Sequence, residues 1–243
     1  FTRYFWDIPQ EIPGIQKGRF PMQYKAVIFD LDGTLINSLD DLADSANAML
    51  EGYGYPTFPV ERYRYFVGNG SRKLIERVLP EAKRTPEFID EALAKYKGIY
   101  EKNILTKTRP YAGILEMLAT LRQQGIPLGL CTNKHQEAAT AIVSGLFPAG
   151  TFQQVMGDRP GYPRKPDPTT ALEIAVALGA KPAETAYLGD SLVDMQTGVN
   201  AGFLPVGVLW GFREKAELVE HGAAVLLEKP AELLEKVDFV GKK

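Results

Sequence analysis

The stretch Ala26-Val-Ile-Phe-Asp-Leu-Asp-Gly-Thr-Leu35 decides the fold of this chain. Its first four residues form a short, continuous apolar run, which is typical of a strand buried on both faces of a parallel sheet. Asp30 and Asp32 follow, and residues i and i+2 of an extended chain lie on the same side. Gly33 permits a tight exit turn. An isolated Asp-Gly would be no more than a turn, so the other strand ends must decide whether these carboxylates form a site.

Similar apolar runs recur along the chain and alternate with amphipathic stretches. The runs lie at residues 127–131, 185–189 and 205–209, and helical spacing is found at residues 113–124, 134–144, 169–178 and 192–200. Prolines lie where these helices are expected to begin and glycines where they are expected to end. Strands that alternate with helices imply right-handed crossovers. The sequence therefore predicts an α/β fold with a doubly wound parallel sheet.

One interval, between Ile36 and Arg109, breaks this alternation. It shows helical patterns at residues 38–51, 60–66, 71–79 and 86–104 but no convincing buried strand. Because it is too long for a strand-to-helix loop, we expect an inserted α-helical subdomain at residues 36–109, with the core formed by residues 22–35 and 110–243. Residues 1–21 are rich in proline and glycine and lack a signal-peptide pattern, so we expect an appended leader or a cloning remnant.

Composition narrows the classes of partner. The chain of 243 residues is 45% hydrophobic and 24% charged, as in ordinary globular proteins, and its formal charge is −2. There is no basic surplus for nucleic acid or for an acidic membrane surface, and no apolar run approaches a membrane span. We therefore expect a small-molecule substrate, a cytoplasmic monomer or homodimer and, with the single Cys131, no internal disulfide.

Polar residues follow the other expected strands as well. Thr132 and Asn133 come after the second run, with a hydroxyl and backbone amides suited to phosphate oxygens; Lys165 precedes a helix start; and Asp190 and Asp194 follow the third run. Each residue alone has an ordinary interpretation as a cap or a solvated charge. Their joint occurrence at successive strand ends favours a site, because ligands of open parallel sheets bind beyond the carboxyl ends of the strands.

This inventory of side chains indicates phosphoryl chemistry with a magnesium ion. Mg²⁺ prefers one or two carboxylates together with water and substrate phosphate. With two histidines and one cysteine in the whole chain, a zinc site is poorly supplied. Carboxylates are established nucleophiles for phosphoryl groups, and a metal ion and a lysine would then neutralise charge in the transition state.

Four segments together resemble the four signature motifs of the haloacid dehalogenase superfamily: Phe29-Asp-Leu-Asp-Gly-Thr-Leu35, Thr132, Lys165-Pro166 and Gly189-Asp-Ser-Leu-Val-Asp194. The likeness extends from Met22 to about Pro230. It implies a Rossmann-like core, a bound Mg²⁺, an aspartyl-phosphate intermediate and a helical cap over the substrate.

The resemblance also assigns roles to residues. Asp30 would be the nucleophile and a metal ligand, and Asp32 the general acid/base and a ligand through its backbone carbonyl. Thr132 would bind phosphate, Lys165 would neutralise it, and Asp190 would complete the metal site. Of the remaining candidates, Asp194 would lie behind the ligands or bind only occasionally, and Asn133 and Gly33 would contact the substrate phosphate.

Within the superfamily the chain is most similar to bacterial phosphoglycolate phosphatases. The likeness is carried by Ile126-Pro-Leu-Gly-Leu-Cys-Thr-Asn-Lys134, Val67-Gly-Asn-Gly70 and residues 207–212. Gly68 to Ser71 leads into an expected helix, whose first amides favour an anion, and Arg72 adds positive charge. We therefore expect Arg72 to bind a second anionic group of the substrate, such as the carboxylate of 2-phosphoglycolate. Asn37 departs from the aspartate of many relatives, with at most a local change in hydrogen bonding.

Several alternatives share these residues. A dehalogenase would need neither Mg²⁺ nor an acid at Asp32, so it is disfavoured. A sugar-phosphate phosphatase or a phosphomutase of the same fold would use every core motif. A phosphonate hydrolase would need a lysine in the cap, for which Lys73 is the candidate. A non-catalytic binding or regulatory protein would have no need of the intact set of motifs.

Overall fold

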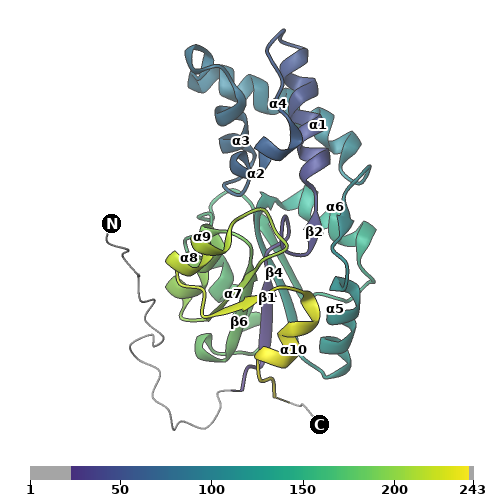
Figure 1. The fold of residues 1–243 in the computed structure, drawn as a ribbon, viewed down its shortest axis with the longest axis vertical. Coiled ribbons are helices and arrows are strands. Elements are labelled where there is room, and N and C mark those ends of the chain that lie inside the picture. Colours follow the sequence, from purple (N-terminus) through teal and green to yellow (C-terminus); the bar gives the residue numbers. More distant parts are fainter. Residues whose placement is uncertain (1–22, 241–243) are drawn as a thin grey trace, which may run out of the picture.

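The computed structural model describes residues 23–240, and its centre is a six-stranded parallel sheet (Figure 1). The strands, in their spatial order, are β5 (Gln154–Asp158), β4 (Leu128–His135), β1 (Ala26–Phe29), β6 (Thr185–Gly189), β7 (Leu204–Val208) and β8 (Val225–Leu227). This confirms the predicted α/β class with a doubly wound parallel sheet. The leader expected at residues 1–21 lies outside the described residues.

Both faces of the sheet are covered, which explains the continuous apolar runs. In β1, Val27 and Phe29 pack with α5 (Ile114–Gln123), α6 (Gln136–Leu146) and α10 (Leu233–Lys236), whereas Ile28 packs with α7 (Thr169–Ala177). α8 (Leu192–Ala201) covers β6 and β7 on the same side as α7 (Figure 1). Because alternate side chains enter two different apolar layers, a buried central strand requires an apolar residue at every position.

The order of the strands identifies the edge at which a ligand would bind. From β1 the chain proceeds to β4 and β5 on one side, and then returns to place β6 against the other side of β1. The sheet therefore reverses its direction of winding between β1 and β6, and open α/β sheets bind ligands at the carboxyl ends of the strands beside such a switch point. Asp30 follows β1 and Asp190 follows β6.

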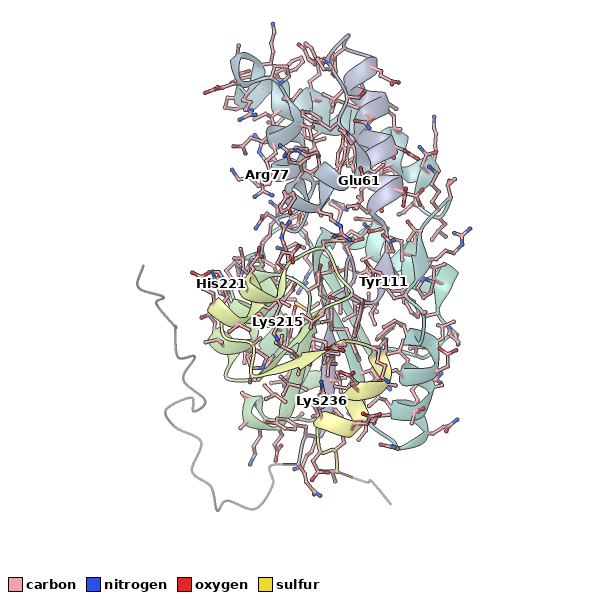
Figure 2. All side chains as sticks on the ribbon, viewed as in Figure 1. Glu61, Arg77, Tyr111, Lys215, His221 and Lys236 are labelled. Carbon is pink, nitrogen blue, oxygen red and sulfur yellow. The ribbon has the colours of Figure 1, made fainter. Side chains whose placement is uncertain are left out.

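Four helices between β2 (Ile36–Asn37) and β3 (Arg109–Pro110) form what we call the helical insert, residues 36–109: α1 (Leu39–Glu51), α2 (Tyr63–Phe66), α3 (Ser71–Val78) and α4 (Pro86–Asn103). They build an apolar cluster that is largely their own and lie beyond the end of the sheet (Figure 1). β2 and β3 pair antiparallel, so the chain enters and leaves the insert side by side. Tyr111, labelled in Figure 2, donates its backbone N–H to Leu35 at this junction (3.1 Å).

Some elements were not expected from the sequence. β5 and β8 form the two edges of the sheet, and both are half-buried, so neither shows a continuous apolar run. A helix was expected to begin at residue 134, but Lys134 and His135 still belong to β4, and α6 begins at Gln136. The reason is that His135 pairs with Asp158 of β5, which prolongs the strand. Within residues 23–240, no helix is long and apolar enough to cross a membrane.

Candidate active site

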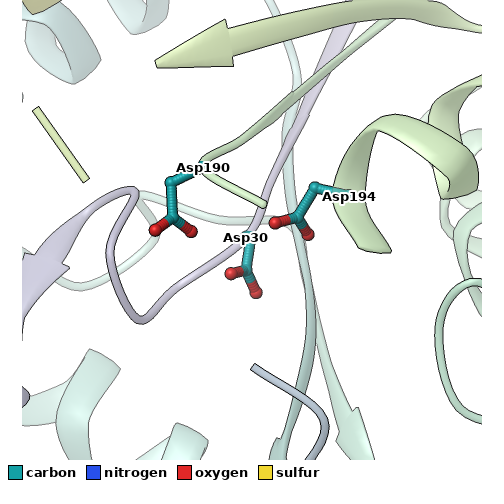
Figure 3. A group of neighbouring side chains, drawn as sticks. All are labelled: Asp30, Asp190 and Asp194. Atoms are coloured by element: carbon teal, nitrogen blue, oxygen red, sulfur yellow. The ribbon is translucent and has the colours of Figure 1, made fainter. Parts of the chain in front are cut away.

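Three buried aspartates meet at the switch point of the sheet. Asp30 follows β1, Asp190 follows β6, and Asp194 lies in the first turn of α8. One carboxylate oxygen from each lies within 4.8 Å of the others (Figure 3). The sequence predicted Asp30 and Asp190 as partners and gave Asp194 a supporting place, and the fold brings all three into one cluster.

Lys165 lies beside this cluster and is itself buried. Its Nζ is 2.8 Å from Oδ1 of Asp30 and 2.6 Å from Oδ1 of Asp194. Asn133 fixes the backbone that carries the lysine: its Oδ1 accepts a hydrogen bond from the Lys165 N–H (2.9 Å), and its Nδ2 donates to the Lys165 carbonyl (3.2 Å). Asp194 is oriented in turn by Ser191, whose N–H and hydroxyl both donate to Asp194 Oδ2.

Burial makes the negative charge of this cluster costly. It raises the pKa of Asp30 to about 7, an effect that Lys165 opposes and Asp194 reinforces. The pKa of Asp190 lies well above its ordinary range because of burial and of the neighbouring Asp194 and Asp30. A divalent cation would favour the ionised carboxylates, and hard oxygen ligands are those that Mg²⁺ prefers. The residues therefore fit a divalent metal ion.

Two glycines allow the chain to approach Asp190 closely. Gly33 has a φ of +89°, and a Cβ at this position would lie 2.2 Å from Asp190 Oδ2. A Cβ at Gly211 would lie 2.3 Å from the Asp190 Cβ. Asp190 Oδ2 also accepts a hydrogen bond from the Phe212 N–H (2.7 Å). Gly33 is thus required for the shape of the acidic cluster, although it does not line the cavity described below.

Asp32 lies in a second, separate group of side chains. Its two carboxylate oxygens are each 3.0 Å from Nζ of Lys134, and Oδ1 also accepts a hydrogen bond from the Ser38 hydroxyl (2.5 Å). Lys134 is not among the site residues that the sequence predicts, because its place in the sequence indicates the start of a helix. No signal in the sequence could have revealed it, because its position depends on the irregular pairing of β4 with β5 between Cys131 and His135.

A cavity of about 380 Å³ lies between the end of the sheet and the helical insert. Its core side presents most of the polar groups, and the insert contributes mainly apolar side chains and glycines, together with Ser71, Lys97 and Glu101. The core residues that line it include Asp30, Asp32, Thr132, Asn133, Lys134, Asp190, Phe212 and Arg213, and those of the insert include Leu42, Val67, Gly68, Gly70, Ser71, Leu74, Tyr96, Tyr100 and Ile104. This volume falls within the usual range of small-molecule sites, ~300–1,000 Å³.

Arg72 is placed differently from what its sequence neighbours indicated. It forms an ion pair with Asp90 on the surface of the insert and is not among the residues that line the cavity. Gly70, Ser71 and Leu74 line the cavity, so one side of α3 faces inward, whereas Arg72 at the second position of the helix lies on the side that points away. An anion-binding role for Arg72 therefore has no geometric support.

The loop Val67–Gly70 is held over the cavity from two sides. On the core side, Arg213 donates to the Val67 carbonyl (3.0 Å), and Asn133 Nδ2 donates to the Gly68 carbonyl (3.2 Å). Within the insert, Arg77, labelled in Figure 2, donates to Asn69 Oδ1 (2.8 Å). These contacts fix the loop that joins α2 to α3 above the acidic cluster, and neither arginine was expected from the sequence.

Comparisons with known proteins agree with this geometry. Residues 27–208 match the family model described as haloacid dehalogenase-like hydrolase. A phosphoglycolate phosphatase of Thiobacillus denitrificans is 32% identical over 83% of this chain and 90% of its own. An N-acetylmuramic acid 6-phosphate phosphatase of Pseudomonas aeruginosa is 30% identical over 89% of this chain and 96% of its own.

A solved structure from Lactobacillus delbrueckii subsp. bulgaricus, provisionally named a phosphoglycolate phosphatase, superposes with a TM-score of 0.82 at 33% identity, and the match covers 87% of this chain and 97% of that one. The chain belongs to the haloacid dehalogenase-like hydrolases, which confirms the family predicted from the four motifs. Its relatives and structural neighbours support a phosphatase within that family.

Proposed function

We propose that this chain is a magnesium-dependent phosphomonoester hydrolase that acts through an aspartyl-phosphate on Asp30, with 2-phosphoglycolate as its substrate. One observation carries the proposal: Asp30 lines the cavity and lies at the switch point of the sheet within 4.8 Å of carboxylate oxygens of Asp190 and Asp194. Asp30 and Asp190, with the Asp32 carbonyl, would hold the metal ion. Bound there, Mg²⁺ would neutralise charge on the phosphoryl oxygens.

The protein's own groups account for the two chemical steps. In the first, a carboxylate oxygen of Asp30 attacks phosphorus, and the bond from phosphorus to the alcohol oxygen breaks. The ammonium of Lys165, 2.8 Å from Asp30, balances charge on the transferred group. Thr132 and Asn133 line the cavity beside it and bind phosphoryl oxygens. In the second step water attacks phosphorus, which releases phosphate and restores Asp30.

Asp32 moves the proton in both steps. It gives a proton to the oxygen of the leaving alcohol as the ester bond breaks, and as a carboxylate it then takes a proton from the attacking water. Its side chain lines the same cavity as Asp30 but is not part of the metal-binding cluster. That separation suits a group that must face the alcohol instead of the metal ion.

The choice of 2-phosphoglycolate rests on the relatives and on the start of α3. The names of several relatives give phosphoglycolate as their substrate. Gly70 and Ser71 line the cavity, and the first amides of a helix favour an anion such as the substrate carboxylate. A phosphorylated amino sugar is a second candidate, because the cavity of about 380 Å³ has room for one and a relative is named for such a substrate.

The test is phosphate release by the purified chain with Mg²⁺. We expect kcat/KM for 2-phosphoglycolate to exceed that for 2-hydroxyethyl phosphate, in which a neutral hydroxyl replaces the carboxylate, by on the order of tenfold. A higher kcat/KM for N-acetylmuramic acid 6-phosphate would transfer the assignment to the second candidate. Absence of phosphate release from every ester, including 4-nitrophenyl phosphate, would refute the proposed chemistry.

A further inference from the structure

Each of the two aspartates of the first motif, Asp30 and Asp32, forms an ion pair with a different lysine. Lys165 Nζ lies 2.8 Å from Asp30, whereas Lys134 Nζ lies 3.0 Å from each carboxylate oxygen of Asp32. The Lys134 side chain is only 6% exposed. A buried ammonium needs a partner, and among the described residues Asp32 is the one carboxylate with which Lys134 forms an ion pair.

The backbone of β4 explains how Lys134 reaches Asp32. β4 pairs regularly with β5 as far as Cys131 and Met156, and the next pair is His135 with Asp158. Four steps along β4 therefore oppose two along β5. Such an irregularity re-aims side chains and is frequent beside active sites. It occupies the stretch from Thr132 to Lys134, whose residues line the cavity.

The helical insert completes this arrangement. Lys134 Nζ lies over the ring of Tyr100 on α4, 4.8 Å from the ring centre. A third hydrogen bond to the Asp32 carboxylate comes from the hydroxyl of Ser38, the residue immediately before α1. Asp32 is therefore held by Lys134 from the core and by Ser38 from the start of the insert. The Tyr100 ring of the insert packs against the Lys134 ammonium.

We propose that Lys134 is a positioning residue, which fixes the carboxyl group of Asp32 at the oxygen of the leaving alcohol. This rests on the proposed function, in which Asp32 passes its proton to that oxygen while phosphorus is transferred to Asp30. Lys134 exchanges no proton in this step. Because its ion pair is with Asp32 and not with the acidic cluster, its contribution to catalysis passes through Asp32.

A double-mutant cycle tests this dependence. Lys134→Met keeps the length of the side chain and removes its charge. With 2-hydroxyethyl phosphate, whose alcohol must be protonated as it leaves, we expect kcat/KM to fall by on the order of tenfold or more. In an Asp32→Asn background the same substitution should change kcat/KM by less than about twofold, since it then has no carboxyl group to position. An equal loss in both backgrounds would overturn the proposal.

The leaving group supplies an independent readout. The nitrophenolate of 4-nitrophenyl phosphate leaves without protonation, so Lys134→Met should affect this substrate about tenfold less than 2-hydroxyethyl phosphate. Equal losses for the two would indicate a merely structural role and contradict the proposal. A loss confined to 2-phosphoglycolate would show that Lys134 binds the substrate carboxylate, which also contradicts it.

Controls separate this inference from the proposed function. Lys97→Met removes another lysine that lines the cavity and should leave the ratio between the two substrates unchanged. Should Lys134→Met fail to fold, Ser38→Ala removes the other hydrogen bond to Asp32 and must shift the ratio in the same direction. If Asp32→Asn lowers kcat/KM equally for 2-hydroxyethyl phosphate and 4-nitrophenyl phosphate, the acid role of Asp32 in the proposed function is wrong. If Asp32→Asn lowers kcat/KM more for 2-hydroxyethyl phosphate but neither Lys134→Met nor Ser38→Ala does so, the acid role stands and the positioning role of Lys134 is wrong.

Discussion

The carboxyl end of the sheet and the helical insert face each other across one cavity, but they are built from opposite kinds of residues. The sheet end presents the buried carboxylates Asp30 and Asp190, and Lys165, which does not line the cavity itself, forms an ion pair with Asp30. The insert presents the side chains of Leu74 and Tyr96 and a loop of glycines, and its Arg72 points outward. From this difference we expect the core to supply the chemistry and the insert to limit which alcohol can reach it.

The largest expected effect comes from the nucleophile. Asp30→Asn should lower turnover by at least about a thousandfold, because an amide does not attack phosphorus and no other group takes over the nucleophilic step. The fold should remain, since the two side chains have nearly the same shape. Phosphate release measures the loss of turnover, and circular dichroism tests whether the fold remains. Near-normal turnover in this variant would show that the chemistry lies elsewhere.

Metal removal should be almost as severe. Exhaustive chelation should abolish phosphate release, and Mg²⁺ should restore it, whereas Ca²⁺ should bind without restoring it because its looser coordination misplaces the attacking carboxylate. Thermal denaturation provides a readout that does not depend on turnover: Mg²⁺ should raise Tm in the wild type and raise it less in Asp190→Asn. Full activity after chelation would contradict the metal-binding assignment of the acidic cluster.

Lys165 should matter for stability as well as for turnover. Lys165→Met leaves Asp30 and Asp194 buried without their cation, a change that typically costs about 3–5 kcal/mol. The matched control is Lys25→Met, because Lys25 pairs with Glu184 on the surface, where such pairs contribute roughly 0–1 kcal/mol. Urea denaturation gives the free energy of unfolding of both variants, and their losses relative to wild type are then compared. Equal losses would mean that the buried ion pairs add no more stability than an exposed one.

On the insert side the effects should depend on the size of the substrate. Leu74→Phe places a larger side chain in the cavity wall and should lower kcat/KM for 4-nitrophenyl phosphate by on the order of tenfold, with a smaller loss for 2-phosphoglycolate. Leu79→Phe alters a buried residue of the insert outside the lining and serves as the control for repacking. Losses that are the same for both substrates would argue against a limit set by shape.

The smallest effect is expected at Arg72. Its ion pair with Asp90 is exposed, and exposed pairs contribute roughly 0–1 kcal/mol. Arg72→Ala should therefore leave the preference for 2-phosphoglycolate over 2-hydroxyethyl phosphate within about twofold of wild type. A selective tenfold loss in kcat/KM for 2-phosphoglycolate would return the anion-binding role to Arg72.

The sequence by itself determined the class of fold and most residues of the candidate site. Buried central strands such as 26–29 need an apolar residue at every position, so they are visible as continuous runs, and polar residues directly after them must lie at one edge of a parallel sheet. That local rule is why Asp30, Thr132 and Asp190 could be named together. It did not find β5 and β8, because an edge strand is half-exposed and carries a weaker pattern.

Only the tertiary structure decided which charges meet. Lys134 and Arg72 both follow motif residues in the sequence, yet one is buried against Asp32 and the other pairs with Asp90 on the surface. The first outcome depends on an irregular ladder between β4 and β5, and the second on the side of α3 that faces the cavity. The pairing of one strand with another and the packing of a helix against the rest of the fold are long-range contacts. They cannot be predicted from the residues that flank a position in the sequence.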